Sequence, residues 1–226
     1  MALLSFADDA AFWSALQTRP REFLDETTSA SLSQRISSAD MDQVCQAFAA
    51  IVDAKSPFTA DHSRRVAGYA VRIGEALGLD SMQKTRLWQA GLLHDLGKLG
   101  VPNLILVKPG KLTDDEWETI RRHPEWTARI LADLPALADV RRVAAAHHEK
   151  LDGSGYWRGL GESQLSLEMR VLAVADIFDA LTAERPYRRG MTQKEVEAIL
   201  WREANVTLDG ACIEAVLGMT ALRQAA

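Results

Sequence analysis

The sequence predicts an all-α protein, and three observations lead to this fold class. Apolar residues recur at intervals of three and four through most of the chain, which is the spacing of one face of a helix. No segment shows the alternating apolar and polar pattern of a β-strand over any useful length. Glycine and proline gather between the helical segments, where they end helices. A chain of 226 residues can therefore form one sizeable helical domain with a small extension.

The first segment carries a rough amphipathic pattern over residues 3–24, which is interrupted at Pro20. A hydroxyl-rich stretch at 27–40 follows it and has the composition of a linker. We therefore expect two parts: a short N-terminal helical extension of unknown role at 1–39, and a main domain at 40–226.

An apolar stripe marks the next helix, for which Asp40 is the expected N-cap. The stripe consists of six side chains at three- and four-residue spacing: Met41, Val44, Cys45, Phe48, Ile51 and Val52. Such a stripe usually packs against a protein core, and it is also the pattern of a helical dimer seam. Both readings stay open, so a homodimer through the 41–52 helix is one expectation.

Further helices are expected downstream, at about 60–78, 83–96, 113–132, 137–150, 167–184 and 192–204. Two connections between them are long, 97–112 and 151–166, and both are rich in glycine. Because long loops in a compact helical domain often carry function, we expect both to contribute to a site.

Composition and charge exclude several classes of protein. The net charge of −5 argues against non-specific binding of nucleic acid. No apolar run approaches the ~18 residues that a membrane span needs, and the N-terminus lacks the basic region of a signal peptide. We therefore expect a cytoplasmic protein without a membrane partner. Cys45 and Cys212 lie in apolar helical patterns, which indicates two buried thiols rather than a disulfide framework.

The most informative side chains are imidazoles and carboxylates. The chain has five histidines: His62, His94, His123, His147 and His148. Asp95 follows His94 directly, and Asp176 interrupts the strongly apolar segment "RVLAVADIFDAL". A buried carboxylate without a partner costs several kcal/mol, so Asp176 needs a cation or hydrogen-bond donors. A salt bridge to an arginine would satisfy any one of these residues, but hardly all of them at once.

Imidazole and carboxylate together are the ligand set of first-row transition metals. Five histidines and two aspartates exceed what one ion can use, and they fit two ions that share a bridging carboxylate. Lys98 lies one helical turn after His94 and Asp95 and can share their face. The pattern therefore indicates that His94 and Asp95 share metals and that Lys98 faces an anion bound there.

An ordered series of motifs resembles the HD-GYP branch of the HD superfamily of metal-dependent phosphohydrolases. The motifs are "HSRRVAGYA" (62–70), "AGLLHDLGKLGVP" (90–102), "LVKPGKLTDDEW" (106–117), "RRHPEWTARIL" (121–131), "AAHHEKLDGSGYW" (145–157) and "LAVADIFDALTAERPYRRG" (172–190). The resemblance extends over about residues 58–215. It implies an HD-domain helical bundle with two long functional loops.

The resemblance also implies a dinuclear metal centre. One ion would be held by His62, His94, Asp95 and Asp176. The second would share Asp95 as a bridge and be held by His123, His147 and His148. Some members bind a third metal through a glutamate at the position of Phe58, which cannot ligate, so two ions are expected here. Iron and manganese suit such a site, and zinc or nickel could occupy it.

The activity implied by the resemblance is hydrolysis of cyclic di-GMP, or of a related cyclic dinucleotide, to a linear dinucleotide and then to GMP if a second cleavage follows. Asp95 and Lys98 would be the catalytic residues, with Lys98 on the scissile phosphate. Tyr156, Arg185 and Arg188 would hold the rest of the nucleotide.

One position departs from the family pattern. Trp157 stands where the GYP motif has its proline, so the loop loses the fixed φ of proline and gains an aromatic surface. This change bears on substrate fit and on recognition of a signalling-protein partner.

Two other functions remain open at this stage. The first is an HD phosphohydrolase acting on another phosphate ester, against which the "DGSGY" loop and the "RPYR" segment argue. The second is a metal-bound cyclic-dinucleotide sensor or interaction module without turnover. The complete ligand set argues against this second alternative, while Trp157 and the short N-terminal region keep it open.

Overall fold

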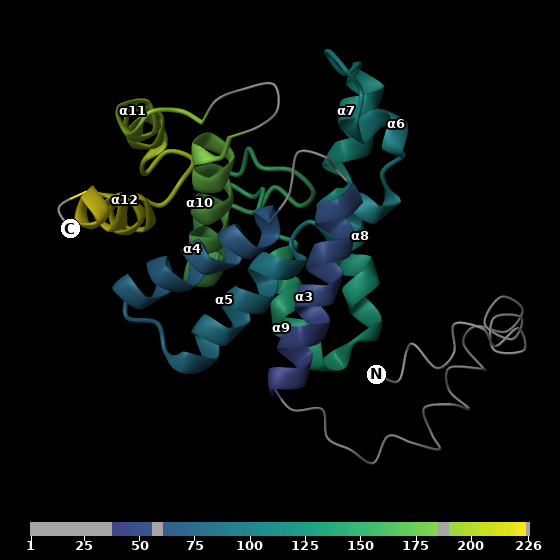
Figure 1. The fold of residues 1–226 in the computed structure, drawn as a ribbon, viewed down its shortest axis with the longest axis horizontal. Coiled ribbons are helices and arrows are strands. Elements are labelled where there is room, and N and C mark those ends of the chain that lie inside the picture. The colour runs from purple at the N-terminus through teal and green to yellow at the C-terminus, as the bar shows by residue number, and fades with distance from the viewer. Residues whose placement is uncertain (1–37, 56–60, 185–189, 225–226) are drawn as a thin grey trace, which may run out of the picture. The chain divides into compact units, whose positions relative to one another are not determined.

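The computed structural model describes residues 38–55, 61–184 and 190–224 (Figure 1). All regular elements in these ranges are helices, which confirms the all-α prediction. Two isolated β-bridges join loop residues, Asp152 to Gly161 and Ala204 to Leu208. The predicted extension at 1–39 lies outside the described residues, apart from its last two positions. Asp40 falls in the first turn of the helix that begins at Ser38, so it is not the N-cap that was expected.

Longer helices alternate with short helical turns along the chain. The α-helices are α3 (Ser38–Lys55), α4 (His62–Ala76), α5 (Ser81–Leu93), α6 (Asn103–Leu106), α7 (Asp114–Arg121), α8 (His123–Ile130), α9 (Ala138–Ala144), α10 (Leu167–Thr182), α11 (Gln193–Glu203) and α12 (Gly210–Gln224). A 3₁₀ helix, η2 (Leu96–Gly100), directly follows the His94–Asp95 pair. Helix α12 lies beyond the last predicted helix range, and it contains Cys212, which was expected in an apolar helical pattern.

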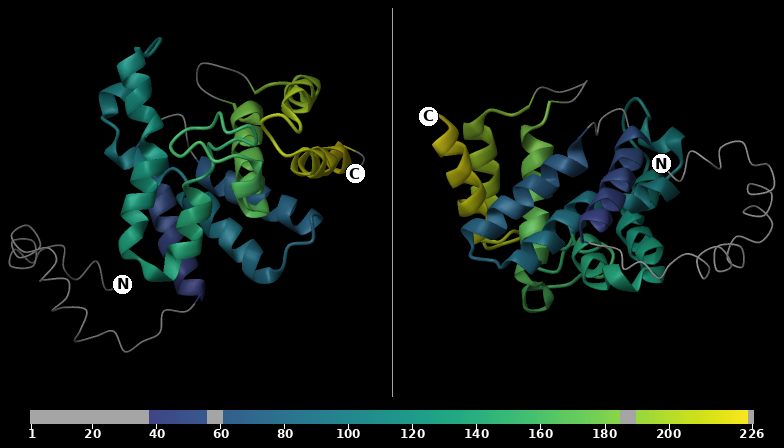
Figure 2. Two further views of the ribbon diagram at one scale, coloured as in Figure 1. Left: turned by 180° about the vertical axis from the view of Figure 1, so that it is seen from behind. Right: turned by 60° about the horizontal axis from the view of Figure 1, so that its bottom comes forward.

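Three helices form the centre of the fold. Helix α4 packs along α5 and against α10. Helices α11 and α12 lie on one side of α10, and α8 lies on the opposite side, where it packs against η2 (Figures 1 and 2). Gly91 allows the close approach of α5 to α4, because a Cβ at this position would lie 2.5 Å from the Cα of Ala67. The fully buried side chains of Ile73, Leu87 and Leu172 fill the space between these helices.

Several helices end earlier than the periodicity predicted, and they end beside histidines. Helix α5 stops at Leu93 and α9 at Ala144, so His94 and His147 lie in the turns that follow. The single helix expected at 113–132 is two helices, α7 and α8. Pro124 explains this break, since its ring cannot continue a helix but fits the first turn of a new one.

The apolar stripe on α3 divides between core and solvent. Cys45 and Val52 are buried. Val44, Phe48 and Ile51 are 43%, 37% and 55% exposed, so only part of the stripe packs against the core. The homodimer through α3 stays a prediction, and these three exposed side chains are where it would form. None of the described helices is long and apolar enough to cross a bilayer.

Candidate metal centre

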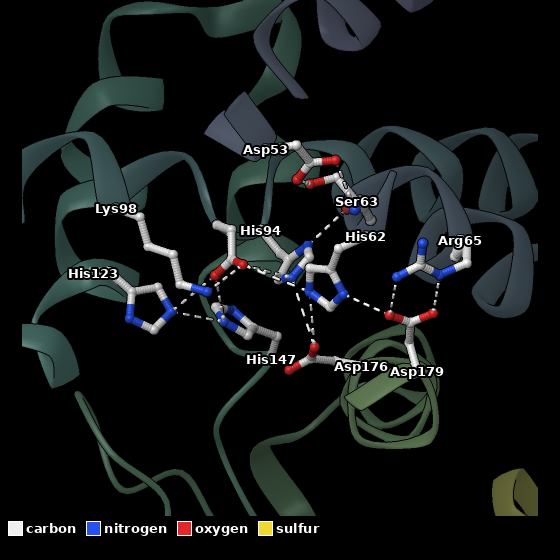
Figure 3. A network of polar contacts seen from close by, with 12 residues as sticks. Asp53, His62, Ser63, Arg65, His94, Lys98, His123, His147, Asp176 and Asp179 are labelled. Carbon is white, nitrogen blue, oxygen red and sulfur yellow. Dashed lines mark hydrogen bonds and ion pairs between the residues drawn. The ribbon is translucent and has the colours of Figure 1, made fainter. Parts of the chain in front are cut away.

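The described residues bring the five histidines and both predicted aspartates to one largely buried place. Figure 3 labels four of these histidines and Asp176. They come from the start of α4 (His62), the turn after α5 (His94 and Asp95), the start of α8 (His123), the turn after α9 (His147 and His148) and the middle of α10 (Asp176). Segments separated by more than 100 residues in sequence thus meet at one point. The site is built mostly at helix ends, where a side chain can point along a helix axis as well as away from it.

Asp95 lies at the centre of this cluster and is 2% exposed. Its Oδ2 is 3.7 Å from His62 Nε2 and 3.4 Å from His94 Nε2. Its Oδ1 is 3.3 Å from His123 Nε2 and 3.9 Å from His147 Nε2. The two carboxylate oxygens therefore face two different groups of histidines, which is the arrangement that a bridging carboxylate needs.

Hydrogen bonds fix the ring orientation of three of the histidines. His94, His123 and His147 each donate from Nδ1 to the carbonyl oxygen three residues earlier, at 2.7 Å in every case. In the neutral ring this leaves Nε2 unprotonated, with its lone pair directed into the cluster. The backbone thus sets the tautomer that a metal ligand requires.

These lone pairs lack protein donors in the part of the chain that the structure describes. His94 Nε2 is buried without a hydrogen-bond partner. The Nε2 atoms of His123 and His147 lie 3.0 Å apart, and two lone pairs at this distance repel each other unless a cation or a proton lies between them. The donor set therefore fits a bound metal ion.

Three groups of side chains offer ligand atoms that all lie within 4.8 Å of one another. They are His62 with His94 and Asp176, His94 with Asp95 and His147, and His123 with His147 and His148. The groups overlap at His94 and His147. Together they account for all seven residues that the sequence nominated. The first and the third group share no residue, so each of them could hold an ion of its own.

Electrostatics keep most of the cluster in its ligating form. Burial lowers the pKa of His123 to about 3 and that of His148 to about 4, so both rings are neutral at pH 7. Burial would raise the pKa of Asp95, but Lys98 and the surrounding imidazoles outweigh it and hold this pKa well below its usual range. His62 behaves differently, because its hydrogen bonds to Asp176 and Asp179 outweigh the effect of burial and raise its pKa to about 10.

Asp179 is a functional residue that the sequence analysis missed. Its Oδ2 lies 2.7 Å from His62 Nδ1, and its carboxylate accepts two hydrogen bonds from the guanidinium of Arg65, at 2.7 and 3.0 Å (Figure 3). Asp179 thus orients His62 and is itself held by Arg65. The available signal was its place in "DIFD", three residues after Asp176 on a helix that is otherwise apolar.

We expect the change Asp179→Asn to weaken metal binding about 10- to 100-fold, because a carboxylate that orients a ligating histidine also raises its basicity. The amide keeps the shape of the side chain but removes its charge. Competition with a fluorescent chelator measures the affinity. An unchanged metal affinity would show that Asp179 serves only to fix α4 to α10.

Lys98 also lies at this centre. The sequence analysis expected it to share a face with His94 and Asp95. Its Nζ lies 2.5 Å from Asp95 Oδ2, and its side chain is about one quarter exposed, at 23%. The turn that carries it is fixed against α8, because a Cβ on Gly97 would lie 1.9 Å from the carbonyl oxygen of His123. Thr127 adds to this attachment, accepting from Gly97 N and donating to the carbonyl of His94.

A second lysine, which the sequence analysis also missed, holds this turn from the other side. Lys55 Nζ, at the end of α3, donates to the carbonyl oxygens of Lys98, Leu99 and Val101 at 3.0, 2.6 and 2.8 Å. Three acceptors on one short turn use the full donor capacity of an ammonium group. Lys55 therefore connects α3 to the backbone that positions Lys98.

We expect Lys55→Met to lower the turnover of the metal-loaded protein about 10- to 100-fold, because a small displacement of Lys98 misplaces its charge. Metal content should stay unchanged. Steady-state kinetics with metal analysis would measure both, and Lys84→Met on α5 is a matched control. If Lys55→Met lowered thermal stability but left turnover intact, the contact would be structural only.

Tyr156 lies at the edge of the cluster, so the structure places this predicted substrate contact beside the metal ligands. Its ring centroid is 4.5 Å from that of His148, and Arg121 lies over its ring at 5.9 Å. The carboxylate of the buried Glu149 accepts from the backbone amides of Arg158 and Leu160, and so holds the loop in place. The predicted contacts Arg185 and Arg188, like Phe58, lie outside the described residues.

Trp157 adopts a backbone conformation that proline cannot reach. Its φ is 95°, whereas the proline ring fixes φ near −65°. The loop thus uses a backbone conformation that is open to it only because position 157 lacks the fixed φ of proline, in agreement with the expectation from the sequence. A side chain at this φ is strained, and the neighbouring hydrogen bonds to Glu149 maintain the conformation.

We expect Trp157→Pro to destabilise the protein by more than ~1 kcal/mol, because proline placed at an incompatible φ costs more than the entropy it saves. Trp157→Phe, which keeps an aromatic ring and a free φ, is the matched control and should lose less. Chemical denaturation measures the free energy of unfolding of both. Equal stability of Trp157→Pro and wild type would contradict the positive φ.

Comparisons with known proteins agree with this geometry. Residues 46–212 match the family model described as HD domain. The "3'3'-cGAMP-specific phosphodiesterase 3" of Vibrio cholerae is 46% identical over 178 residues, covering 79% of this chain and 39% of the relative. A cyclic di-GMP phosphodiesterase of Pseudomonas aeruginosa is 44% identical over 139 residues, or 61% of this chain and 34% of the relative. The chain thus spans about two fifths or less of the length of these curated relatives.

Solved structures give the same result for the fold. The crystal structure of a cyclic GMP-AMP specific phosphodiesterase of Vibrio cholerae has a TM-score of 0.55 at 35% identity, covering 96% of this chain and 50% of that one. An HDG"Y"P protein from Bdellovibrio bacteriovorus has a TM-score of 0.63, and the match covers 91% of this chain and 80% of that protein's chain. At 16% identity, this second likeness concerns the fold alone.

Proposed function

The chain belongs to the HD domain family, and from this premise we propose that it is a metal-dependent phosphodiesterase that hydrolyses a cyclic dinucleotide. The observation that carries the proposal is the position of Asp95 between two groups of histidines. Within the described residues, His94 Nε2 is buried without a hydrogen-bond partner, and the Nε2 atoms of His123 and His147 lie 3.0 Å apart. This arrangement can hold two ions next to Lys98, whose ammonium group is paired with Asp95 in the structure.

The proposed ligands follow the division of the cluster by Asp95. One ion would be held by His62, His94, Asp95 and Asp176. The other would be held by Asp95, His123, His147 and His148. We propose iron or manganese as the metals, because both suit mixed histidine and carboxylate ligands. When bound, two such ions would supply a nucleophilic water at neutral pH and neutralise charge on the phosphate.

The chain's own residues would place the substrate and stabilise its charge. Lys98 forms an ion pair with Asp95 in the structure, and metal ions at Asp95 would compete with its ammonium group for the same carboxylate. Lys98 could then turn to the scissile phosphate and stabilise the charge that builds up on it. Tyr156 would pack against the substrate at the edge of the centre, where its ring is half-buried.

The substrate class is proposed from the relatives. Those reported above act, by name, on 3'3'-cGAMP and on cyclic di-GMP, and they are 46% and 44% identical to this chain over the matched residues. We propose that this chain cleaves one or both of these compounds to a linear dinucleotide. A further cleavage to mononucleotides requires the linear product to bind again.

Turnover of cyclic di-GMP and of 3'3'-cGAMP, followed in parallel by chromatography, tests the proposal. The protein is loaded with iron(II) or manganese, and its metal content is measured before the assay. A linear dinucleotide that forms with wild type establishes the activity and names the preferred substrate. If protein with two bound ions cleaves neither compound, the phosphodiesterase proposal fails. Saturable substrate binding in that protein would then favour the non-catalytic sensor.

A further inference from the structure

A second pocket lies on the other side of the segment that carries His147 and His148. Its volume is about 440 Å³, within the usual range for small-molecule sites. The segment 145–149 contributes to both places. Ala145, Ala146 and Glu149 line the pocket, whereas His147 and His148 belong to the metal-ligand cluster. The pocket is therefore separate from the candidate metal centre but shares a stretch of backbone with it.

Positive charge predominates on the walls of this pocket. Arg141 and Arg142 enter it from α9, and Arg158 enters it from the loop after Tyr156. Among the described residues, the guanidinium of Arg141 makes no hydrogen bond or ion pair, and that of Arg142 has only a distant ion pair, at 3.9 Å, with Asp139. The carboxylate of Glu149 is occupied by the backbone amides of Arg158 and Leu160. The three guanidinium groups are thus available to an anion.

The same pocket offers a flat aromatic surface and an apolar floor. Trp157 lines it, and the guanidinium of Arg158 stacks on the indole at 4.1 Å. Leu160 and Met169 add apolar surface. Strained backbone is concentrated at functional sites, and the positive φ of Trp157 places such strain at the wall of this pocket.

From this combination we propose that the pocket is a second, non-catalytic site that binds a nucleoside phosphate. Its phosphate would be held by Arg141 and Arg158, since guanidinium forks pair well with phosphate oxygens. Its base would pack against Trp157, because aromatic rings stack on any nucleobase. Through the shared segment 145–149, the bound ligand would change the position of His147 and His148 and hence turnover. This effect on turnover rests on the proposed function, whereas the binding does not.

Equilibrium binding of GMP to the metal-loaded protein tests the site. GMP is the probe, and guanosine and inorganic phosphate show whether both parts of the ligand are needed. We expect Arg141→Gln combined with Arg158→Gln to weaken GMP binding about tenfold or more, because two charge-assisted contacts are lost. Arg202→Gln, at an exposed position on α11, should leave the affinity unchanged.

The metal centre itself could bind GMP, and Asp95→Asn separates the two sites. Binding that persists in Asp95→Asn and is lost in the double arginine variant supports the pocket. Binding that is lost in Asp95→Asn and persists in the double arginine variant overturns the proposal. Absence of saturable binding by wild type at millimolar GMP overturns it as well. Tryptophan fluorescence gives a second readout, since Trp157→Phe should remove the change in emission that GMP produces. This outcome does not depend on whether the protein hydrolyses any cyclic dinucleotide.

Discussion

Replacement of Asp95 by asparagine is expected to reduce hydrolysis of the cyclic dinucleotide to background and to lower the bound metal below two ions per chain. Both oxygens of Asp95 face histidine groups, so the amide loses one ligand atom and the negative charge that attracts both ions. Asp95 is also the ion-pair partner of Lys98 in the structure. The pair is only partly buried, since the Lys98 side chain is 23% exposed, so the free energy of unfolding is expected to fall by less than the ~3–5 kcal/mol of a fully buried pair.

Metal analysis, turnover and chemical denaturation on the same preparation measure these three effects. Asp115→Asn is the matched control, because Asp115 is exposed on α7 and is not among the candidate metal ligands. It should retain wild-type metal content and activity. A variant at Asp95 that kept two ions and measurable turnover would show that another group bridges the metals.

Replacement of Lys98 by methionine is expected to lower turnover about 100- to 1,000-fold, which is the usual effect of removing one group that stabilises transition-state charge. Lys98 is not among the proposed metal ligands, and its Nζ contacts the centre only through Asp95 Oδ2 among the described atoms. Metal content should therefore remain at the wild-type level. The loss should appear in kcat more than in KM if the ammonium acts mainly in the transition state.

Lys111→Met is the matched control for this variant, since Lys111 lies in the same long loop and is exposed. Steady-state kinetics with metal quantification distinguish the effects. If Lys98→Met lost its metals, Lys98 would serve the ligand geometry rather than the phosphate. Nearly normal turnover in a fully loaded variant would remove Lys98 from the proposed mechanism.

The sequence was sufficient to nominate the members of the metal cluster because their chemistry is exceptional in an apolar helical chain. Asp176 within "RVLAVADIFDAL" has no reason to be buried without a cation or donors. All five histidines proved to lie together with Asp95 and Asp176. The all-α fold was predicted from the spacing of apolar residues along the chain. This spacing depends only on residue type, because apolar side chains are the ones that folding buries.

The helix ends could not be predicted from periodicity. His94 and His147 continue an apolar pattern, and yet α5 and α9 stop before them. The end positions depend on contacts between distant segments, such as the hydrogen bond from Thr127 to the carbonyl of His94. Helix propensity changes little over one or two residues, so these tertiary contacts decide where each helix stops.

The supporting contacts were harder to predict, since, apart from the place of Asp179 in "DIFD", each of these residues is an ordinary charged side chain in the sequence. Asp179 and Arg65 are 114 positions apart, and Lys55 and Lys98 are 43 apart, so nothing local relates them. The same is true of Trp157, whose identity was known but whose positive φ depends on the amides that Glu149 binds. The sequence by itself determined which side chains carry the chemistry, because residue type and burial preference are local properties. Only the tertiary structure decided how those side chains are oriented, because orientation depends on hydrogen bonds between segments that folding brings together.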